Sequence, residues 1–350
     1  MKWAGAIRGK LGRVSRSIRN RLRPRGIILL YHRVAEVQSD PWSLSVTPKH
    51  FAEQLEALRS VARPLRLSEL TEKVRDRRSP SRSVAVTFDD GYVDNLQNAK
   101  PLLERYEVPA TVFVSTGYVD QDRGFWWDEL DRVLLESKSL PRSLHLNING
   151  SDYHWELGTT VGYAEEMASE NRCWRAWSKE DPTPRHSLYR AIYQLLHHLP
   201  AEKQRKIVDD LLTWAGARRV ACSESRPLKS QELLTLTRGS LIDIGSHTIT
   251  HPVLSARPVD CQQDEIQQSK TFLETVLGSS VTSFAYPHGR PSDYTMETVN
   301  IVRKAGFSCA CSTVAGAVQR DSDPFQLPRI HVEDYDGENF LRLLSRWLNA

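Results

Sequence analysis

SVAVTFDDG, residues 83–91, is a short apolar run that ends abruptly in two carboxylates and a glycine. Its β-branched residues show no polar alternation, which is typical of a strand buried on both faces of a parallel sheet. Functional side chains of α/β barrels lie at the carboxyl ends of such strands. We therefore predict a buried strand at 83–88 and treat Asp89 and Asp90, which follow it, as candidate site residues.

Similar apolar segments recur on both sides of this strand and alternate with helical patterns. Buried strands are expected at 27–32, 110–115, 241–246, 281–286 and 306–313, and helices at 48–60, 68–77, 94–106, 258–277 and 292–305. Alternation of strands and helices indicates a mostly parallel sheet. Its repetition favours an α/β barrel over a sandwich.

Residues 119–228 break this alternation and hold six of the nine tryptophans. Residues 143–157 alternate around Asn149-Gly150, a pair that suits a type I′ turn and therefore predicts a hairpin. Helices are expected at 186–199 and 201–216. We interpret this stretch as a Trp-rich insertion that forms a lid or side wall. Its aromatic rings either stack on sugar rings or only pack the insertion itself.

The composition is that of a soluble globular protein, with 350 residues, 40% of them hydrophobic and 26% charged. It excludes collagen-like, mucin-like and wholly disordered chains. No run of about 18 apolar residues is present, so no membrane-spanning helix is expected. The five cysteines include no C-x-x-C pair, which argues for a reducing compartment. The expected location is cytoplasmic, with attachment to the inner membrane face as an alternative.

Residues 1–25 form a basic arm with nine Lys and Arg and no Asp or Glu. Apolar residues at helical spacing predict an amphipathic helix, and no apolar core of a secretory signal follows. This arm either contacts an anionic membrane surface, packs on the body of the protein, or serves as a mitochondrial-type presequence. The remainder is net acidic, which argues against a nucleic-acid binder.

Two further motifs follow predicted strands. In DIGSHTITHP, residues 243–252, His247 and His251 are four residues apart, so a helical turn or a tight loop brings both rings to one ion. With one carboxylate they leave open positions, as catalytic metal sites do. Such a pair also arises by chance, as we expect for exposed His197 and His198. In SFAYPHG, residues 283–289, a Pro/Gly turn could offer a backbone N–H to an oxyanion.

TFDDGY, SHTITH and FAYPHG, in this order and each at a strand end, resemble the polysaccharide deacetylase family (carbohydrate esterase family 4). ILLYHRV, LSVTPKHFAEQLEAL and LPRI are similar to its exopolysaccharide-processing branch. The resemblance covers about 26–118 and 229–335. It implies a distorted (β/α) barrel of the polysaccharide deacetylase type at 26–118 and 229–350, interrupted by the insertion at 119–228 and preceded by the arm at 1–25.

The resemblance also implies roles for individual residues in a metal-dependent deacetylation. Asp89 would be the general base, and Tyr286 would offer its backbone N–H to the oxyanion. Arg329, in LPRI, would keep Asp89 charged and oriented. The metal ligands would be Asp90, His247 and His251, holding a divalent ion: zinc first, with cobalt, nickel, iron and manganese as alternatives.

The chain departs from the family pattern in two places. Phe284-Ala285 replaces an Arg-containing version of the third motif, so the base needs Arg329 as its cationic partner. No clear Leu-x-x-His motif supplies the general acid. His32, at the end of the first strand, is our preferred acid, and His331 is the alternative. His288, Pro287 and His331 are further candidates for substrate contact.

The predicted function is therefore a metal-dependent hydrolase that removes N-acetyl groups from an amino-sugar glycan or a glycan intermediate. One alternative is a non-catalytic carbohydrate-binding protein on a deacetylase-like barrel, although such a protein needs no base. Others within the fold are a small-molecule amide deacetylase, a deformylase or an O-acetyl esterase.

Overall fold

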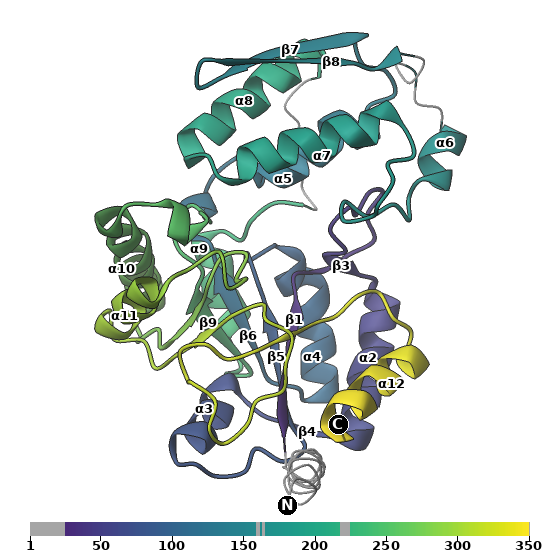
Figure 1. Ribbon diagram of the computed structural model, residues 1–350. Helices are drawn as coiled ribbons and strands as arrows, with labels where there is room; N and C mark the ends of the chain where they lie inside the picture. The colour runs from purple at the N-terminus through teal and green to yellow at the C-terminus, as the bar shows by residue number, and fades with distance from the viewer. Residues whose placement is uncertain (1–24, 159–161, 163–164, 218–224, 350) are drawn as a thin grey trace, which may run out of the picture.

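The computed structural model describes residues 25–158, 162, 165–217 and 225–349. Its centre is a curled parallel sheet in the order β11-β10-β9-β6-β5-β1-β12, with β4 paired to β5 (Figure 1). The strands are β1 (Gly26–Tyr31), β4 (Arg63–Pro64), β5 (Ser83–Phe88), β6 (Ala110–Val114), β9 (Ile242–Ser246), β10 (Ser283–Ala285), β11 (Cys309–Cys311) and β12 (Ile330–His331). The fold is thus a distorted (β/α) barrel, as predicted.

Alternating residues of the strands face the inside of this barrel. One hydrophobic cluster contains Ile28, Ala85, Phe113 and Ala285, whereas their chain neighbours pack in a second cluster under the helices. The inside is crowded, since a Cβ on Gly245 would lie 2.3 Å from the Phe113 ring. Because side chains alternate between the two faces of a strand, every second residue beyond a strand end also points towards the inside of the barrel.

The segment from Leu327 to His331, which includes β12, closes the barrel between β11 and β1. Leu327 donates its N–H to the carbonyl of Ala310 at 2.9 Å, on the β11 side. Three residues later, Ile330 and His331 pair with Leu29 and Leu30 of β1. The LPRI motif is therefore the closing element, and it carries a fully buried Arg329.

Helices cover the outside of the sheet, and α2 and α12 lie side by side on one flank (Figure 1). Thr47 caps α2 by accepting from the N–H of His50, and Pro48 begins the helix. The covering helices are α2 (Pro48–Val61), α4 (Lys100–Tyr106), α9 (Ser230–Thr237), α10 (Val259–Leu277), α11 (Met296–Lys304) and α12 (Gly337–Asn349). Helix α3 (Leu67–Arg75) instead packs Leu67, Leu70 and Val74 against the inner cluster.

The predicted strands and helices are present, but β10 and β11 are shorter than the strands expected at 281–286 and 306–313, and two helices differ in detail. The helix expected at 94–106 begins as a wider π-helical turn, η1 (Asn95–Ala99), before α4. The helix expected at 292–305 begins only at Met296. Asp293 instead donates its N–H to the carbonyl of Arg290 in a turn, and Thr295 caps the helix. Polar residues after Pro291 favour this turn over an earlier helix start.

The Trp-rich segment lies above the carboxyl ends of the strands (Figure 1). It contains α5 (Trp126–Asp131), η3 (Arg132–Glu136), the hairpin β7 (Ser143–Ile148) and β8 (Ser151–Glu156), α6 (Glu165–Glu170), α7 (Pro184–His197) and α8 (Ala201–Trp214). Its apolar residues form a cluster of their own, which Tyr92 joins. The chain returns to the barrel where Leu228 donates its N–H to the carbonyl of Gly91.

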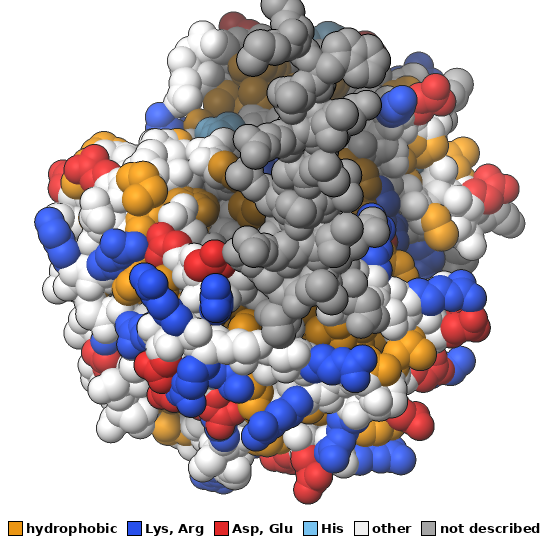
Figure 2. Space-filling view, turned by 60° about the horizontal axis from the view of Figure 1, so that its bottom comes forward, with side chains coloured by type: hydrophobic (Ala, Val, Ile, Leu, Met, Phe, Trp, Pro, Cys, Tyr) orange, Lys and Arg blue, Asp and Glu red, His pale blue; other side chains and the backbone are white. Residues whose placement is uncertain are grey.

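Two short strands, β2 (Arg33–Val34) and β3 (Ser45–Val46), bracket the loop after β1. On the face shown in Figure 2, cationic and anionic side chains are interspersed. Within the described residues, no helix is long and apolar enough to cross a membrane. The predicted basic arm, apart from Arg25, lies outside the described residues.

Candidate active site

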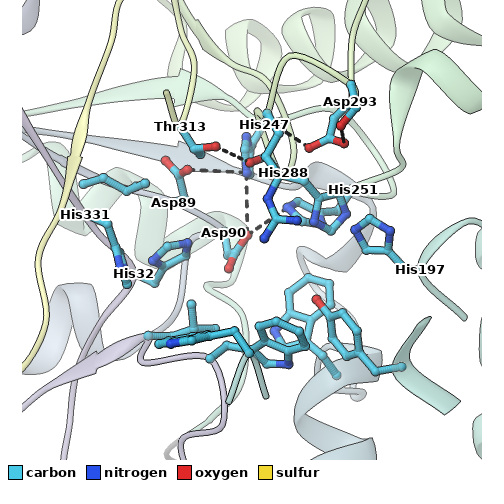
Figure 3. Close-up of a pocket in the computed structure, with 18 of the residues that line it drawn as sticks. His32, Asp89, Asp90, His197, His247, His251, His288, Asp293, Thr313 and His331 are labelled. Carbon is cyan, nitrogen blue, oxygen red and sulfur yellow. Dashed lines mark hydrogen bonds and ion pairs between the residues drawn. The ribbon is translucent and has the colours of Figure 1, made fainter. Parts of the chain in front are cut away.

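A pocket of about 590 Å³ opens between the carboxyl ends of the strands and the insertion (Figure 3). It contains acidic and histidine side chains from six separate stretches of the chain, together with aromatic rings. Of the residues singled out from sequence, those lining it are His32, Asp89, Asp90, His247, His251, His288 and His331. The parallel sheet brings them together because its strands all end at this edge.

Asp89 is held by Arg329 through two short hydrogen bonds. The two terminal nitrogens donate at 2.6 and 2.7 Å to the two carboxylate oxygens, and Nε donates to the carbonyl of Ser312. Burial alone would raise the pKa of Asp89, but the Arg329 and His247 charges outweigh it and lower the pKa to about 2. Asp89 is therefore an ionised and fixed carboxylate.

Asp90, His247 and His251 offer ligand atoms that all lie within 4.8 Å of one another. Asp90 Oδ1 is 3.7 Å from His247 Nε2 and 3.4 Å from His251 Nε2. The same oxygen is buried without a hydrogen-bond partner. Burial, followed by the charge of Asp89, raises the pKa of Asp90 well above its usual value. A buried, unpartnered oxygen facing two imidazoles fits a divalent cation.

The two histidines differ in how their rings are oriented. His247 Nδ1 lies 2.8 Å from the carbonyl of Ala285, so Nδ1 carries the proton and Nε2 is left as the ligand atom. His251 Nδ1 is buried without a partner. Its ring instead packs between those of Trp127 and His288, at centroid distances of 4.9 and 4.5 Å. Packing therefore takes the place of a hydrogen bond at His251.

The His247–His251 segment is a tight loop rather than a helical turn, and Thr248 and His251 have positive φ angles. The Glu265 carboxylate from α10 accepts from the N–H groups of Ile249 and Thr250 at 2.8 and 2.9 Å. From the other side, Gly117 donates its N–H to the carbonyl of Ile249. A Cβ on Gly117 would lie 2.8 Å from that oxygen, so this contact requires glycine.

His32 and His331, the two acid candidates, are neighbours at the pocket wall, with ring centroids 5.8 Å apart. Burial lowers the pKa of His32 to about 3, although Asp89 opposes the shift. Burial also lowers the pKa of His331, where Glu333 and Asp40 oppose it. His32 Nδ1 and His331 Nε2 are buried without hydrogen-bond partners. Only His32 is coupled to the predicted base.

The predicted oxyanion donor is not available in this structure. Tyr286 donates its backbone N–H to the carbonyl of Cys311 at 3.0 Å, because strand pairing continues one residue beyond β10. The side chain is buried, and its hydroxyl donates to the carbonyl of Phe325. Neither Tyr286 nor Pro287 lines the pocket. The roles predicted for Tyr286 at the oxyanion and for Pro287 in substrate contact therefore stay predictions, and this geometry does not favour them.

His288 does line the pocket, and it brings in a residue that we expected to be outside it. The ring of His197, from α7, lies 4.1 Å from that of His288, so His197 is part of the pocket (Figure 3). The expectation that His197 is a chance exposed residue was wrong. His198 is exposed but also lines the pocket. No local pattern could show this, because the contact depends on how the insertion packs on the barrel.

Four aromatic residues line the pocket that were not predicted as site residues from the sequence: Trp42, Trp127, Trp177 and Tyr193. Trp127 donates its indole N–H to the hydroxyl of Tyr92 at 2.7 Å. Tyr92 in turn lies 3.2 Å from a carboxylate oxygen of Asp128. The tryptophan richness of the insertion was the available signal. Most of these rings pack its own cluster.

Comparisons with known proteins agree with this architecture. The family described as polysaccharide deacetylase matches residues 76–138 and 214–310, the two stretches that flank most of the insertion. Over these two stretches, which make up less than half of its length, the chain is similar to the polysaccharide deacetylase family. It is accordingly a hydrolase that acts on amide bonds.

Particular relatives are distant in sequence. The chain is 22% identical to the Bacillus subtilis protein YxkH over 87% of this chain and 70% of that protein. It is also 22% identical to the poly-beta-1,6-N-acetyl-D-glucosamine N-deacetylase of Staphylococcus aureus, over 87% and 72%. The structure of IcaB from Ammonifex degensii matches with a TM-score of 0.57 and 18% identity, over 93% of this chain and 98% of that one.

Proposed function

We propose that this protein removes N-acetyl groups from an amino-sugar glycan and depends on a divalent metal ion to do so. The observation that carries the proposal is the adjacency of two different carboxylates. Asp89 is ionised and held by Arg329, whereas Asp90 has an unpartnered oxygen facing two imidazoles. The Staphylococcus aureus relative is named for deacetylating a polymer of N-acetylglucosamine, and the substrate class is taken from it.

Asp90, His247 and His251 would hold the ion. When bound, a divalent ion supplies positive charge that acidifies a water molecule and polarises the amide carbonyl. Zinc suits one carboxylate and two imidazoles, and cobalt, nickel, iron and manganese are the alternatives. With the Tyr286 N–H committed to the sheet, no backbone donor from the third motif is assigned to the oxyanion.

Asp89 would take the proton from the attacking water. A general base must be unprotonated and correctly directed before the reaction. Arg329 meets both requirements, because its charge keeps Asp89 ionised and its two hydrogen bonds fix the carboxylate plane. Asp89 Oδ2 lies 3.8 Å from His247 Nε2, so the base is next to the metal ligands.

His32 would give a proton to the leaving amine, so that acetate and a free amino sugar depart. The charge of Asp89 favours the protonated form of His32 against the effect of burial, and a general acid must carry its proton before the amine leaves. His331 is the second candidate, since Glu333 and Asp40 favour its charged form. The two rings are close enough that a charge on one disfavours a charge on the other.

The test is acetate release from N-acetylglucosamine oligomers by protein stripped of metal with a chelator and then reloaded with single metals. We expect activity to vanish with the metal and to return with zinc or one of the alternatives. His247→Ala should neither bind the metal nor regain activity. Undiminished acetate release from protein shown to be metal-free by elemental analysis would overturn the metal dependence.

A further inference from the structure

An aromatic wall made of Trp42, Trp177 and Tyr193 lines the pocket that contains Asp89 and Asp90. The Trp42 and Tyr193 rings are 4.2 Å apart between centroids, and those of Trp42 and Trp177 are 6.3 Å apart. Trp177 and Tyr193 belong to the insertion, whereas Trp42 belongs to the loop between β2 and β3. We call these three residues the aromatic shelf.

Hydrogen bonds fix the shelf across the junction between loop and insertion. Ala176, the residue before Trp177, donates its N–H to the carbonyl of Pro41, the residue before Trp42, at 2.8 Å. The indole N–H of Trp42 donates to the hydroxyl of Tyr189 at 2.8 Å. The shelf is therefore built before any ligand arrives, which reduces the entropic cost of binding.

Trp177 is 54% exposed, and no other tryptophan within the described residues is as exposed. The remaining tryptophans of the insertion are buried or partly buried in its cluster. An exposed indole next to a pocket is a surface that packing of the protein itself does not explain. It offers a flat apolar face of the kind that covers the C–H face of a sugar ring.

Polar side chains line the same pocket. Gln194 and Arg290 are exposed, and Ser292 and Asp293 lie nearby on the turn before α11. Asp293 is itself ordered, since one carboxylate oxygen accepts from the N–H of Arg290 and the other from the hydroxyl of Ser292, both at 2.9 Å. A pocket with aromatic faces and polar groups matches a sugar, which has apolar faces and a hydroxyl-bearing edge.

We propose that the aromatic shelf binds a sugar residue adjacent to the one that carries the reacting N-acetyl group. The substrate is then an oligosaccharide or polysaccharide rather than a free monosaccharide. This inference rests on the proposed function for the identity of the reacting group. It adds a binding subsite, formed by the loop at Trp42 and the insertion together, that determines chain-length specificity.

The experiment compares kcat/KM for acetate release from the N-acetylglucosamine tetramer and monomer. We expect a tetramer preference of tenfold or more, falling towards one in Trp177→Ala through an increase in KM. Trp177→Phe, which retains an aromatic face, should keep much of the preference. Met296→Ala, which removes a similarly exposed apolar side chain outside the pocket, is the matched control. It should leave kcat/KM unchanged for both the tetramer and the monomer.

A binding measurement separates failure of the subsite from failure of the proposed function. Metal-free protein is titrated with the tetramer by calorimetry, and Trp177→Ala should weaken the affinity about tenfold. If no acetate is released from any glycan but this loss of affinity is seen, the subsite stands and the proposed function falls. Equal tetramer affinity in Trp177→Ala and the wild type, or equal kcat/KM for monomer and tetramer, would overturn the subsite.

Discussion

Arg329 donates from both terminal nitrogens to the carboxylate of Asp89, although the two residues are 240 positions apart in the chain. Both are buried inside the barrel. The pairing depends on the segment from Leu327 to His331 closing the barrel beside β1. The conformation of the predicted base is thus set by the last element to complete the sheet.

Arg329→Gln should move the acid limb of the kcat/KM profile to higher pH. The pKa of Asp89, lowered to about 2 in the folded protein, would rise because burial would no longer be opposed by the guanidinium. Leaving one partner of a buried ion pair should also cost about 3–5 kcal/mol of unfolding free energy. Rate profiles and denaturant unfolding would measure the two effects. Arg329→Lys, which keeps the charge, should show a smaller pH displacement.

The same pair predicts acid sensitivity of the wild-type fold. A carboxyl whose pKa is lowered on folding contributes stability above its unfolded pKa of about 3.9, and this contribution is lost as the pH falls towards 2. Acid unfolding of Asp89→Asn should lack this component. If the unfolding free energies of Asp89→Asn and the wild type depended on pH in the same way between roughly pH 4 and 2, the assignment of Asp89 would be contradicted.

Asp89→Asn and Asp90→Asn should separate base from ligand. We expect Asp89→Asn to lose about 10²–10⁴-fold in rate with metal content preserved, because only proton removal is lost. Asp90→Asn should lose the metal, because its Oδ1 faces both histidines. Metal content by elemental analysis and the rate of acetate release together show which residue is the base and which is the ligand. Loss of the metal in Asp89→Asn but not in Asp90→Asn would exchange the two roles.

His32→Ala should lose at least about 10²-fold in rate, whereas His331→Ala should lose far less. The reason is that His32 is coupled to Asp89, while the charged neighbours of His331 are Glu333, Asp40 and Arg329. Both variants should retain the metal, which serves as the control for folding of the site. Collapse of activity in His331→Ala with near wild-type activity in His32→Ala would assign the acid to His331.

Trp127→Ala should weaken metal affinity by about 10–100-fold, the usual effect of removing a group that orients a metal ligand. His251 has no hydrogen bond at Nδ1, so the Trp127 ring at 4.9 Å is one of the ring contacts that orient it, with those of His288 and His247. Trp127→Phe, which keeps a ring but loses the bond to Tyr92, should have a smaller effect. Competition with a metal-sensitive dye would measure the affinity without reference to turnover. Wild-type affinity in Trp127→Ala would show that the ring is dispensable.

Local patterns were sufficient to predict the barrel and the residues that meet at its open end. Apolar runs mark the strands, and the two-residue period points Asp89 inward, as it does Thr87. The resemblance then supplied Arg329. These features depend on short segments and on one general property of parallel sheets.

Other features depend on contacts that no local pattern encodes. Strand pairing extends to Tyr286 and engages its N–H in the sheet, which the motif itself does not reveal. His197 reaches His288 only because α7 packs over the barrel mouth. Trp42 and Trp177 lie far apart in the chain, and hydrogen bonds between the loop and the insertion bring them together.

The two junctions of the insertion are attached to the two loops that carry the ligand candidates. Gly117 donates its N–H to the carbonyl of Ile249 just before the insertion begins, and Leu228, its last residue, donates its N–H to the carbonyl of Gly91. Between these points the chain supplies Trp177 to the pocket wall and Trp127 to the packing of His251, but none of the three metal-ligand candidates. A change in this segment would therefore reshape the wall of the pocket while the proposed ligands stay in the loops of the barrel.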